Sequence, residues 1–299
     1  MTKPLSLIQF TDGKTGSELV EATHRLERLG YHELWLPEFC GREPFATAGY
    51  LLASTERIKI STGIANIYAH DADSAAQGAN TLAELSNGRF TLGLGVSHPM
   101  VVEPRGHTWV KPVEKMRKYL ERIAVAPIES PKPQEPAKVI VAGHGPLLMS
   151  LAAEQADGLF LNMQPVETVR HARDILGPTK ELHVTLRCVL DPDPETARDL
   201  ARRACAAYRG MPAYQKVWAG LGFKEADWVD GSDRLIDAIC AWGDASQLQT
   251  KIQTYYDAGA THVVLYPCHP NEDYLPDSPA SKHWHWDLLE SLALEHKKN

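Results

Sequence analysis

The feature that most constrains this chain is a repeated order of helix, glycine and apolar strand. In each repeat an amphipathic segment stops at a glycine, and a short apolar run follows at once. Glycine just past a helix accepts the left-handed conformation that closes it. The clearest repeats are marked by Gly30, Gly88, Gly158 and Gly259. Alternating helices and short apolar strands predict parallel strands joined by helical crossovers.

The apolar runs predict eight strands: Leu5–Phe10, Glu33–Leu36, Ile58–Gly63, Phe90–Val96, Lys138–Ala142, Leu159–Asn162, His183–Leu190 and His262–Pro267. Eight such units in 299 residues favour a (β/α)8 TIM barrel. The alternative is an open doubly wound sheet, but LIQFTDGKTG lacks the GxGxxG fingerprint expected after its first strand. We predict one domain over residues 1–299, with an insertion at 208–243 that adds helices near the barrel mouth between strands seven and eight.

Composition and charge argue against several classes of protein. The formal net charge is −7 and no basic run is present, so we expect no nucleic-acid partner. The N-terminus lacks the apolar core of a signal peptide, and no apolar run reaches membrane-spanning length. We therefore expect a cytoplasmic protein with no membrane partner. The five cysteines are scattered, with no CxxC pair, which predicts free thiols.

The fourth predicted strand, in GRFTLGLGVSH, has one apolar face and one face of small residues. Its small face contains Thr91, Gly93, Gly95 and Ser97. Glycine weakens a strand interior, so its repetition indicates a close approach to the backbone. In a barrel this face would point inward and place Gly95 and Ser97 near the C-terminal rim, where barrel active sites lie. The alternative is that the glycines only relieve crowding in the core.

Candidate site residues gather where the predicted strands end. They are Glu38 after strand two, Gly63, Asn66, Tyr68 and His70 after strand three, His98 after strand four, and Glu103, Arg105 and His107 beyond it. Each also suits an ordinary loop. We predict no metal site, because metal-binding barrels usually need ligands that converge from several strands with close carboxylates, and strand one offers no HxH.

The turn Gly143-His144-Gly145 follows strand five and precedes Pro146, which suits the first position of a helix. Bare N–H groups and the positive end of a helix dipole favour a phosphate at such a turn. Similar turns also occur without a ligand, so this pattern alone leaves the assignment open.

Taken together, these residues resemble the bacterial luciferase-like monooxygenase superfamily, and most of all its actinobacterial branch of coenzyme F420-dependent oxidoreductases. The resemblance covers strands two to eight. It rests on the stretches GYHELWLPE, GREPF, IKISTGIANIYAHD, TLAELSNGRFTLGLGVSH, RGHTWVKPVEKMRKYL, VAGHGPLLMSLAAEQADGLFLN, AYQKVWAGLGF and DAGATHVVLYP. The run from strand three to strand four is the most specific of these.

The resemblance implies a barrel that binds a flavin or deazaflavin ring across its mouth. It implies a cis peptide between Gly63 and Ile64 that supports the ring, and space cleared by the glycines of strand four. It also implies a cofactor phosphate at the Gly143 turn. The implied cofactor-binding residues are Gly63, Ile64, Asn66, Gly95, Ser97, Gly143, His144 and Gly145.

The chain departs from F420 dehydrogenases of this superfamily at one place. Those enzymes carry an acid–histidine pair after strand two, whereas here Glu38 is followed by Phe39. A proton donor at that place is therefore absent or is replaced by another residue, and we take Glu38, His70 and His98 as the catalytic candidates. His107 is a further candidate.

The resulting interpretation is an F420-dependent oxidoreductase that transfers a hydride between the deazaflavin and an organic small molecule. Arg42, Arg105 and Lys111 are candidates for binding the acidic tail of F420. Two alternatives remain open: an FMN-dependent monooxygenase or reductase, and a cofactor-binding protein without turnover. On the resemblance alone we also expect a homodimer.

Overall fold

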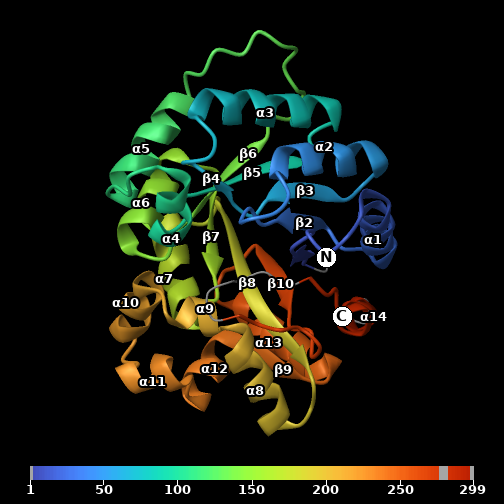
Figure 1. The fold of residues 1–299 in the computed structure, drawn as a ribbon, viewed down its shortest axis with the longest axis vertical. Helices are drawn as coiled ribbons and strands as arrows, with labels where there is room; N and C mark the ends of the chain where they lie inside the picture. Colours follow the sequence, from blue (N-terminus) through green and yellow to red (C-terminus); the bar gives the residue numbers. More distant parts are fainter. Residues whose placement is uncertain (1–2, 276–281, 297–299) are drawn as a thin grey trace.

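The structure is a computed structural model that describes residues 3–275 and 282–296. Its centre is a closed barrel of parallel strands (Figure 1). In order around the barrel they are β1 (Leu5–Ile8), β2 (Glu33–Leu36), β3 (Lys59–Thr62), β5 (Phe90–Gly95), β6 (Lys138–Ala142), β7 (Gly158–Asn162), β8 (Glu181–Leu190) and β10 (His262–Pro267), which pairs with both β8 and β1. The predicted (β/α)8 barrel and its eight strands are confirmed, and the open sheet is excluded.

Two short strands were not predicted. β4 (Ala65–Asn66) continues the line of β3 beyond Gly63 and pairs with β5. β9 (Cys240–Gly243) pairs with the last residues of β8, outside the closed ring. β4 has two residues, too few to give an alternating pattern, and β9 lies at the end of the predicted insertion. Both extend the barrel at the carboxyl ends of its strands.

Helices surround the barrel (Figure 1). The longer ones are α1 (Gly16–Leu29), α2 (Pro44–Ser54), α3 (Ala72–Leu85), α5 (Pro112–Ile123), α6 (Pro146–Gln155), α7 (Val166–Leu176), α8 (Pro194–Ala204), α13 (Ala245–Asp257) and α14 (Trp286–His296). A short α4 (Pro99–Val102) and the 3-10 helix η1 (Glu103–Arg105) follow β5. No helix in the described part of the chain is both long and apolar enough to cross a bilayer.

The predicted insertion is helical. It contains α9 (Ala206–Arg209), α10 (Pro212–Gly220), α11 (Glu225–Asp230) and α12 (Asp233–Ile239). Its apolar side chains, with buried Trp218 among them, form a second core with β8, α8 and β9. All five cysteines are free, as predicted, and only Cys40 is exposed.

The two faces of β5 divide as its sequence predicts. Leu92 and Leu94 pack in the layer between strands and helices. On the inner face, a Cβ added at Gly93 would overlap the Thr62 carbonyl and lie 2.7 Å from the ring of Trp35. Trp35 belongs to the small apolar cluster inside the barrel. Gly93 therefore relieves crowding in the core, which is the simpler of the two readings for that position.

Candidate active site

The rim residues predicted after strands two and three meet at the mouth of the barrel. The Glu38 carboxylate accepts a hydrogen bond from the Asn66 backbone N–H at 2.8 Å. The same Oε2 atom lies 3.1 Å from Nε2 of His70. Glu38 follows β2, whereas His70 lies between β4 and α3, so the pairing of β2 with β3, which β4 continues, brings them together. The Glu38 side chain is 8% exposed and that of His70 is 18% exposed.

Electrostatics favour a charged Glu38–His70 pair. The hydrogen bond to Glu38 raises the pKa of His70, against the opposing effect of burial. Burial alone would raise the pKa of Glu38, but the hydrogen bonds from His70 and Asn66 lower it overall. Arg105 strengthens this effect, with Nη1 at 3.5 Å from Glu38 Oε1. Arg105 also donates to the Phe39 carbonyl at 2.7 Å, which ties η1 to the loop after β2.

The end of β3 has the backbone that the resemblance implies. The peptide bond between Gly63 and Ile64 is cis. The Ile64 side chain lies over Gly95, where an added Cβ would come within 2.5 Å of Ile64 Cδ1. Asn66 is buried, and its amide nitrogen Nδ2 has no hydrogen-bond partner among the described residues. Ser97 has a positive φ of 60°, unusual for a residue with a side chain. These residues lie at the carboxyl ends of β3, β4 and β5, which form part of the mouth of the barrel.

His98 and His144 follow β5 and β6 and lie near each other at the mouth. Burial lowers the pKa of His98. Burial, and then the neighbouring His98, lower the pKa of His144 to about 3. Both imidazoles are therefore neutral at physiological pH, so neither acts as a cation. His98 does not contact the Glu38–His70 pair by any hydrogen bond or ion pair in the described residues.

The two glycines of the turn after β6 differ in their surroundings. A Cβ at Gly143 would lie 2.6 Å from Leu148 Cβ, so packing requires glycine there. A Cβ at Gly145 would meet nothing within 4 Å, and Gly145 is the N-cap of α6 with φ −94°. Its backbone therefore suits any residue, and the open space lies at a helix N-terminus. Such a place fits a phosphate.

Sequence reasoning missed a polar network beside this turn. Thr185 Oγ1 donates to Asn162 Oδ1 at 2.5 Å, and Asn162 Nδ2 donates to the Tyr214 hydroxyl at 2.6 Å. The Tyr214 ring on α10 lies 4.6 Å from that of His144, between centroids. The insertion therefore reaches the barrel mouth, as predicted. The position of Asn162 at the end of a strand was the available signal.

Other rim candidates are held apart from the pair. Arg42 donates to the backbone carbonyls of Thr11 and Lys14. His107 is exposed and its ring lies 5.9 Å from that of Tyr68. Lys111 is exposed at the start of α5.

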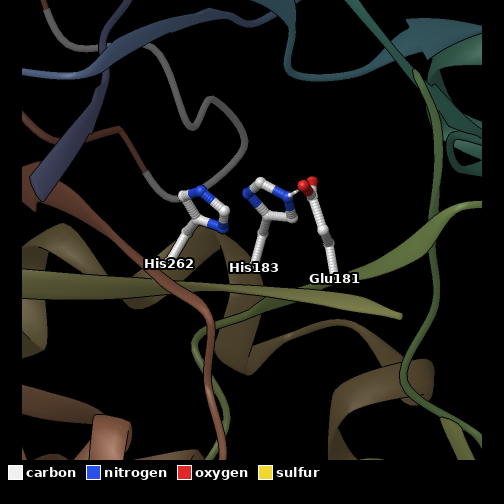
Figure 2. Close-up of side chains that lie close together, drawn as sticks. All are labelled: Glu181, His183 and His262. Atoms are coloured by element: carbon white, nitrogen blue, oxygen red, sulfur yellow. Dashed lines mark hydrogen bonds and ion pairs between the residues drawn. The ribbon is translucent and has the colours of Figure 1, made fainter. Parts of the chain in front are cut away.

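A second group of titratable side chains lies at the opposite end of the barrel, where β8 and β10 begin (Figure 2). His183 Nε2 donates to Glu181 at 2.9 Å, and Lys138 forms an ion pair with the same carboxylate. The His183 and His262 rings stack at 4.2 Å with 5° between their planes. These are the candidate metal ligands among the described residues. Because the His183 and His262 rings are stacked in parallel planes, the in-plane lone pairs of their nitrogens do not converge on a single ion. We call Glu181, His183 and His262 the floor cluster.

A cavity of about 350 Å³ opens beside this floor and is lined in part by Lys3, His32 and His296. None of the predicted cofactor or catalytic residues lines it. Because the chemistry-bearing groups converge at the other end, we place the candidate active site at the mouth.

Comparisons with known proteins agree with this architecture. The family model described as luciferase-like monooxygenase matches residues 7–262. The 5,10-methylenetetrahydromethanopterin reductase of Archaeoglobus fulgidus is 24% identical, over 86% of this chain and 91% of that protein. The F420-dependent glucose-6-phosphate dehydrogenase of Amycolatopsis mediterranei is 22% identical over the same shares, 86% and 91%.

Among solved structures, the coenzyme F420-dependent tetrahydromethanopterin reductase of Methanopyrus kandleri superposes with a TM-score of 0.75. It is 17% identical and covers 99% of this chain and 98% of its own. At that identity the likeness establishes the fold alone. The family model, however, spans most of the chain, and this protein therefore belongs to the luciferase-like monooxygenase family.

Proposed function

We propose that this protein is an F420-dependent oxidoreductase acting on a small organic molecule. The observation that carries the proposal is the Glu38–His70 pair at the barrel mouth, where Glu38 also accepts from the Asn66 backbone N–H. The curated relatives support it, since one is named as F420-dependent and both match along most of their length.

The mouth offers groups that suit a deazaflavin. The buried, unpartnered amide nitrogen of Asn66 fits a carbonyl or ring nitrogen of such a cofactor. Ile64, seated on Gly95, offers an apolar support for a flat ring. The open N-cap at Gly145 would hold the phosphate through backbone N–H groups. When bound, F420 would supply the hydride donor or acceptor, and the protein supplies orientation and electrostatics.

His70 is the residue we assign to proton exchange with the substrate. Its Nε2 is held by Glu38, which leaves Nδ1 to face a reacting group. The raised pKa lets the imidazole hold a proton near neutral pH, where general acid–base catalysis is most efficient. Glu38 acts through His70 as a positioning residue. His70 thereby takes the place of the histidine that is missing after Glu38 in this chain.

The test compares the wild type with His70→Gln and with Glu38→Gln in turnover of F420 against a panel of alcohols, aldehydes and sugar phosphates. We expect His70→Gln to bind F420 as the wild type does and to lose turnover by about 10²–10⁴-fold. Turnover by the wild type with FMN alone would favour the monooxygenase alternative. Tight F420 binding without any turnover would favour the non-catalytic alternative.

Three expectations from the sequence remain proposals. They are a single domain over residues 1–299, a homodimer, and a cytoplasmic location. Light scattering at micromolar concentration measures the oligomeric state, and a monomer there would contradict the dimer.

A further inference from the structure

Arg187 is a charged side chain fully enclosed by the protein. It lies on β8, in register with Tyr266 of β10, and its exposed fraction is 0%. Among the described residues, none of its three guanidinium nitrogens donates to an oxygen atom, and the Cys268 thiol is the hydrogen-bonding group beside it. Thr185 lies two residues before Arg187 on β8 and donates a hydrogen bond to Asn162, the last residue of β7. Arg187 is therefore one step closer to the mouth of the barrel than Thr185.

The titratable groups that act on Arg187 include no carboxylate among the described residues. Its guanidinium lies 3.4 Å from the centroid of the Tyr266 ring and 5.7 Å from that of Tyr208. The other titratable neighbours are the thiols of Cys268 and Cys205. Burial raises the pKa of Cys268 to about 12 and also raises the pKa of Tyr208, so neither is an anion at neutral pH. The Cys205 thiol differs, because its hydrogen bond with Cys240, and then the nearby Arg187, lower its pKa.

A guanidinium does not lose its charge in a protein, so this cation is buried as a cation. Contact with an aromatic face offsets part of the desolvation cost. A thiol is a weak acceptor and satisfies little of the rest. The five N–H donors of Arg187 therefore lack acceptors that a bound oxyanion would provide.

Arginines with a structural role in this chain are satisfied differently. Arg89 is partly buried, and its Nε, Nη1 and Nη2 donate to the Ser86 carbonyl, the Thr55 hydroxyl and the Leu52 carbonyl. Arg89 thus closes a structural network, whereas no nitrogen of Arg187 donates to an oxygen among the described residues. The contrast indicates that the N–H donors of Arg187 are available to a ligand.

We propose that Arg187 binds an anionic oxygen group, a carboxylate or phosphate, on the substrate of this protein. This inference rests on the proposed function and names its substrate class. A planar guanidinium pairs with such a group through two parallel hydrogen bonds, which fixes orientation as well as position. Tyr208 of α9 closes over the guanidinium, so the insertion must yield when the substrate enters.

The first test compares the stability of Arg187→Met and Arg89→Met without ligand. Methionine keeps much of the volume of arginine and removes the buried charge. We expect Arg187→Met to melt at or above the wild-type temperature, because an uncompensated buried cation is lost. Arg89→Met should melt below it. Equal destabilisation by both variants would make Arg187 a structural residue and overturn the proposal.

The second test titrates oxalate, with chloride at equal ionic strength as the control, into the protein with and without F420. We expect a saturable rise in melting temperature with oxalate in the wild type and none in Arg187→Met, with a smaller rise in Arg187→Lys. An equal response in wild type and Arg187→Met would overturn the proposal. So would a loss of F420 binding in Arg187→Met, since the residue would then belong to the cofactor site.

The oxalate response without F420 keeps this inference separate from the proposed function. Oxalate binding that depends on Arg187, in a protein that neither binds nor turns over F420, would refute the function and leave the anion site standing. Turnover of neutral substrates only, unchanged in Arg187→Met, would refute the anion site and leave the function standing.

Discussion

The barrel carries a carboxylate–histidine pair at each end, and the two pairs have different surroundings. At the mouth, Glu38 and His70 are 3.1 Å apart with Arg105 beside the carboxylate. At the floor, Glu181 and His183 are 2.9 Å apart with Lys138 beside the carboxylate. The chemical groups are nearly the same, so chemistry alone does not decide which pair acts on a substrate.

The difference lies in how each histidine is held. His183 sits within regular strand β8, is 2% exposed, and packs between His262 and the edge of Trp35. His70 lies in the loop before α3, with one ring edge against Phe45. A histidine enclosed on both faces stabilises the barrel, whereas one on a loop at the C-terminal rim can meet a substrate. The comparison therefore predicts opposite effects of the same kind of mutation at the two ends.

The largest effect should come from the mouth. His70→Gln should lower turnover by about 10²–10⁴-fold, because the general acid or base is removed. Its melting temperature and F420 affinity should stay close to the wild type, since the ring is partly exposed. Steady-state kinetics and a thermal scan of the same preparation test both halves. A large loss of stability with turnover retained would reverse the comparison.

The floor should respond in the other direction. His183→Ala removes an enclosed ring that packs on Trp35 and His262. We expect a loss of about 2–4 kcal/mol in the free energy of unfolding, as for other large-to-small core changes. Turnover per folded molecule should be unchanged. Urea unfolding measures the first and activity at low temperature the second. Activity loss without destabilisation would move the chemistry to the floor.

The turn after β6 gives a second pair of contrasting positions. Gly145→Val places its side chain in open space and should weaken cofactor binding by about tenfold, or 1.4 kcal/mol, with little change in the melting temperature without cofactor. Gly143→Ala forces a contact with Leu148 and should destabilise the protein itself. Isothermal titration with F420 and thermal scans separate the two. Equal F420 affinity in wild type and Gly145→Val would remove the phosphate assignment.

The smallest effect is a shift in the pH response of the mouth. The pKa of His70 lies above its ordinary value of 6.5, and that of Glu38 below its ordinary value of 4.5. Stability from His70 is present below pH 6.5 and is lost as pH rises through its raised pKa. Stability from Glu38 is present above pH 4.5 and is lost as pH falls through its lowered pKa.

The Glu38→Gln variant tests this pH response. Without the carboxylate the pKa of His70 should fall, and the matching limb of the rate profile should move to lower pH. NMR titration of the His70 ring in wild type and variant measures the shift. An unchanged midpoint would mean that Glu38 does not tune His70.

Much of this arrangement follows from the sequence, because local pattern determines the strands and their ends. The run from Gly63 to His70 indicated a site at the barrel mouth through its glycine, its polar groups and its family resemblance. The sequence did not show that His70 would hydrogen-bond to Glu38, since that contact depends on the register in which β2 pairs with β3. The sequence also did not show that Gly145 has an ordinary backbone conformation, with a φ of −94° that suits any residue.

The floor cluster was missed for a related reason. His183 and His262 are far apart in the chain and become neighbours only in the register of β8 with β10. Arg187 was missed as well, because an arginine in an apolar strand gives no sign of whether its charge is paired. Partners across a closed barrel are a property of the whole sheet, which local sequence patterns do not encode.

We propose that the mouth of this barrel binds F420 for use with the Glu38–His70 pair. An equilibrium titration of F420 and, separately, of FMN into the wild type and His70→Gln, followed by the absorbance and fluorescence of each cofactor, measures this binding. We expect both proteins to bind F420 more tightly than FMN, and His70→Gln to bind F420 with the affinity of the wild type. Preference for FMN, or no binding of either cofactor, would contradict it.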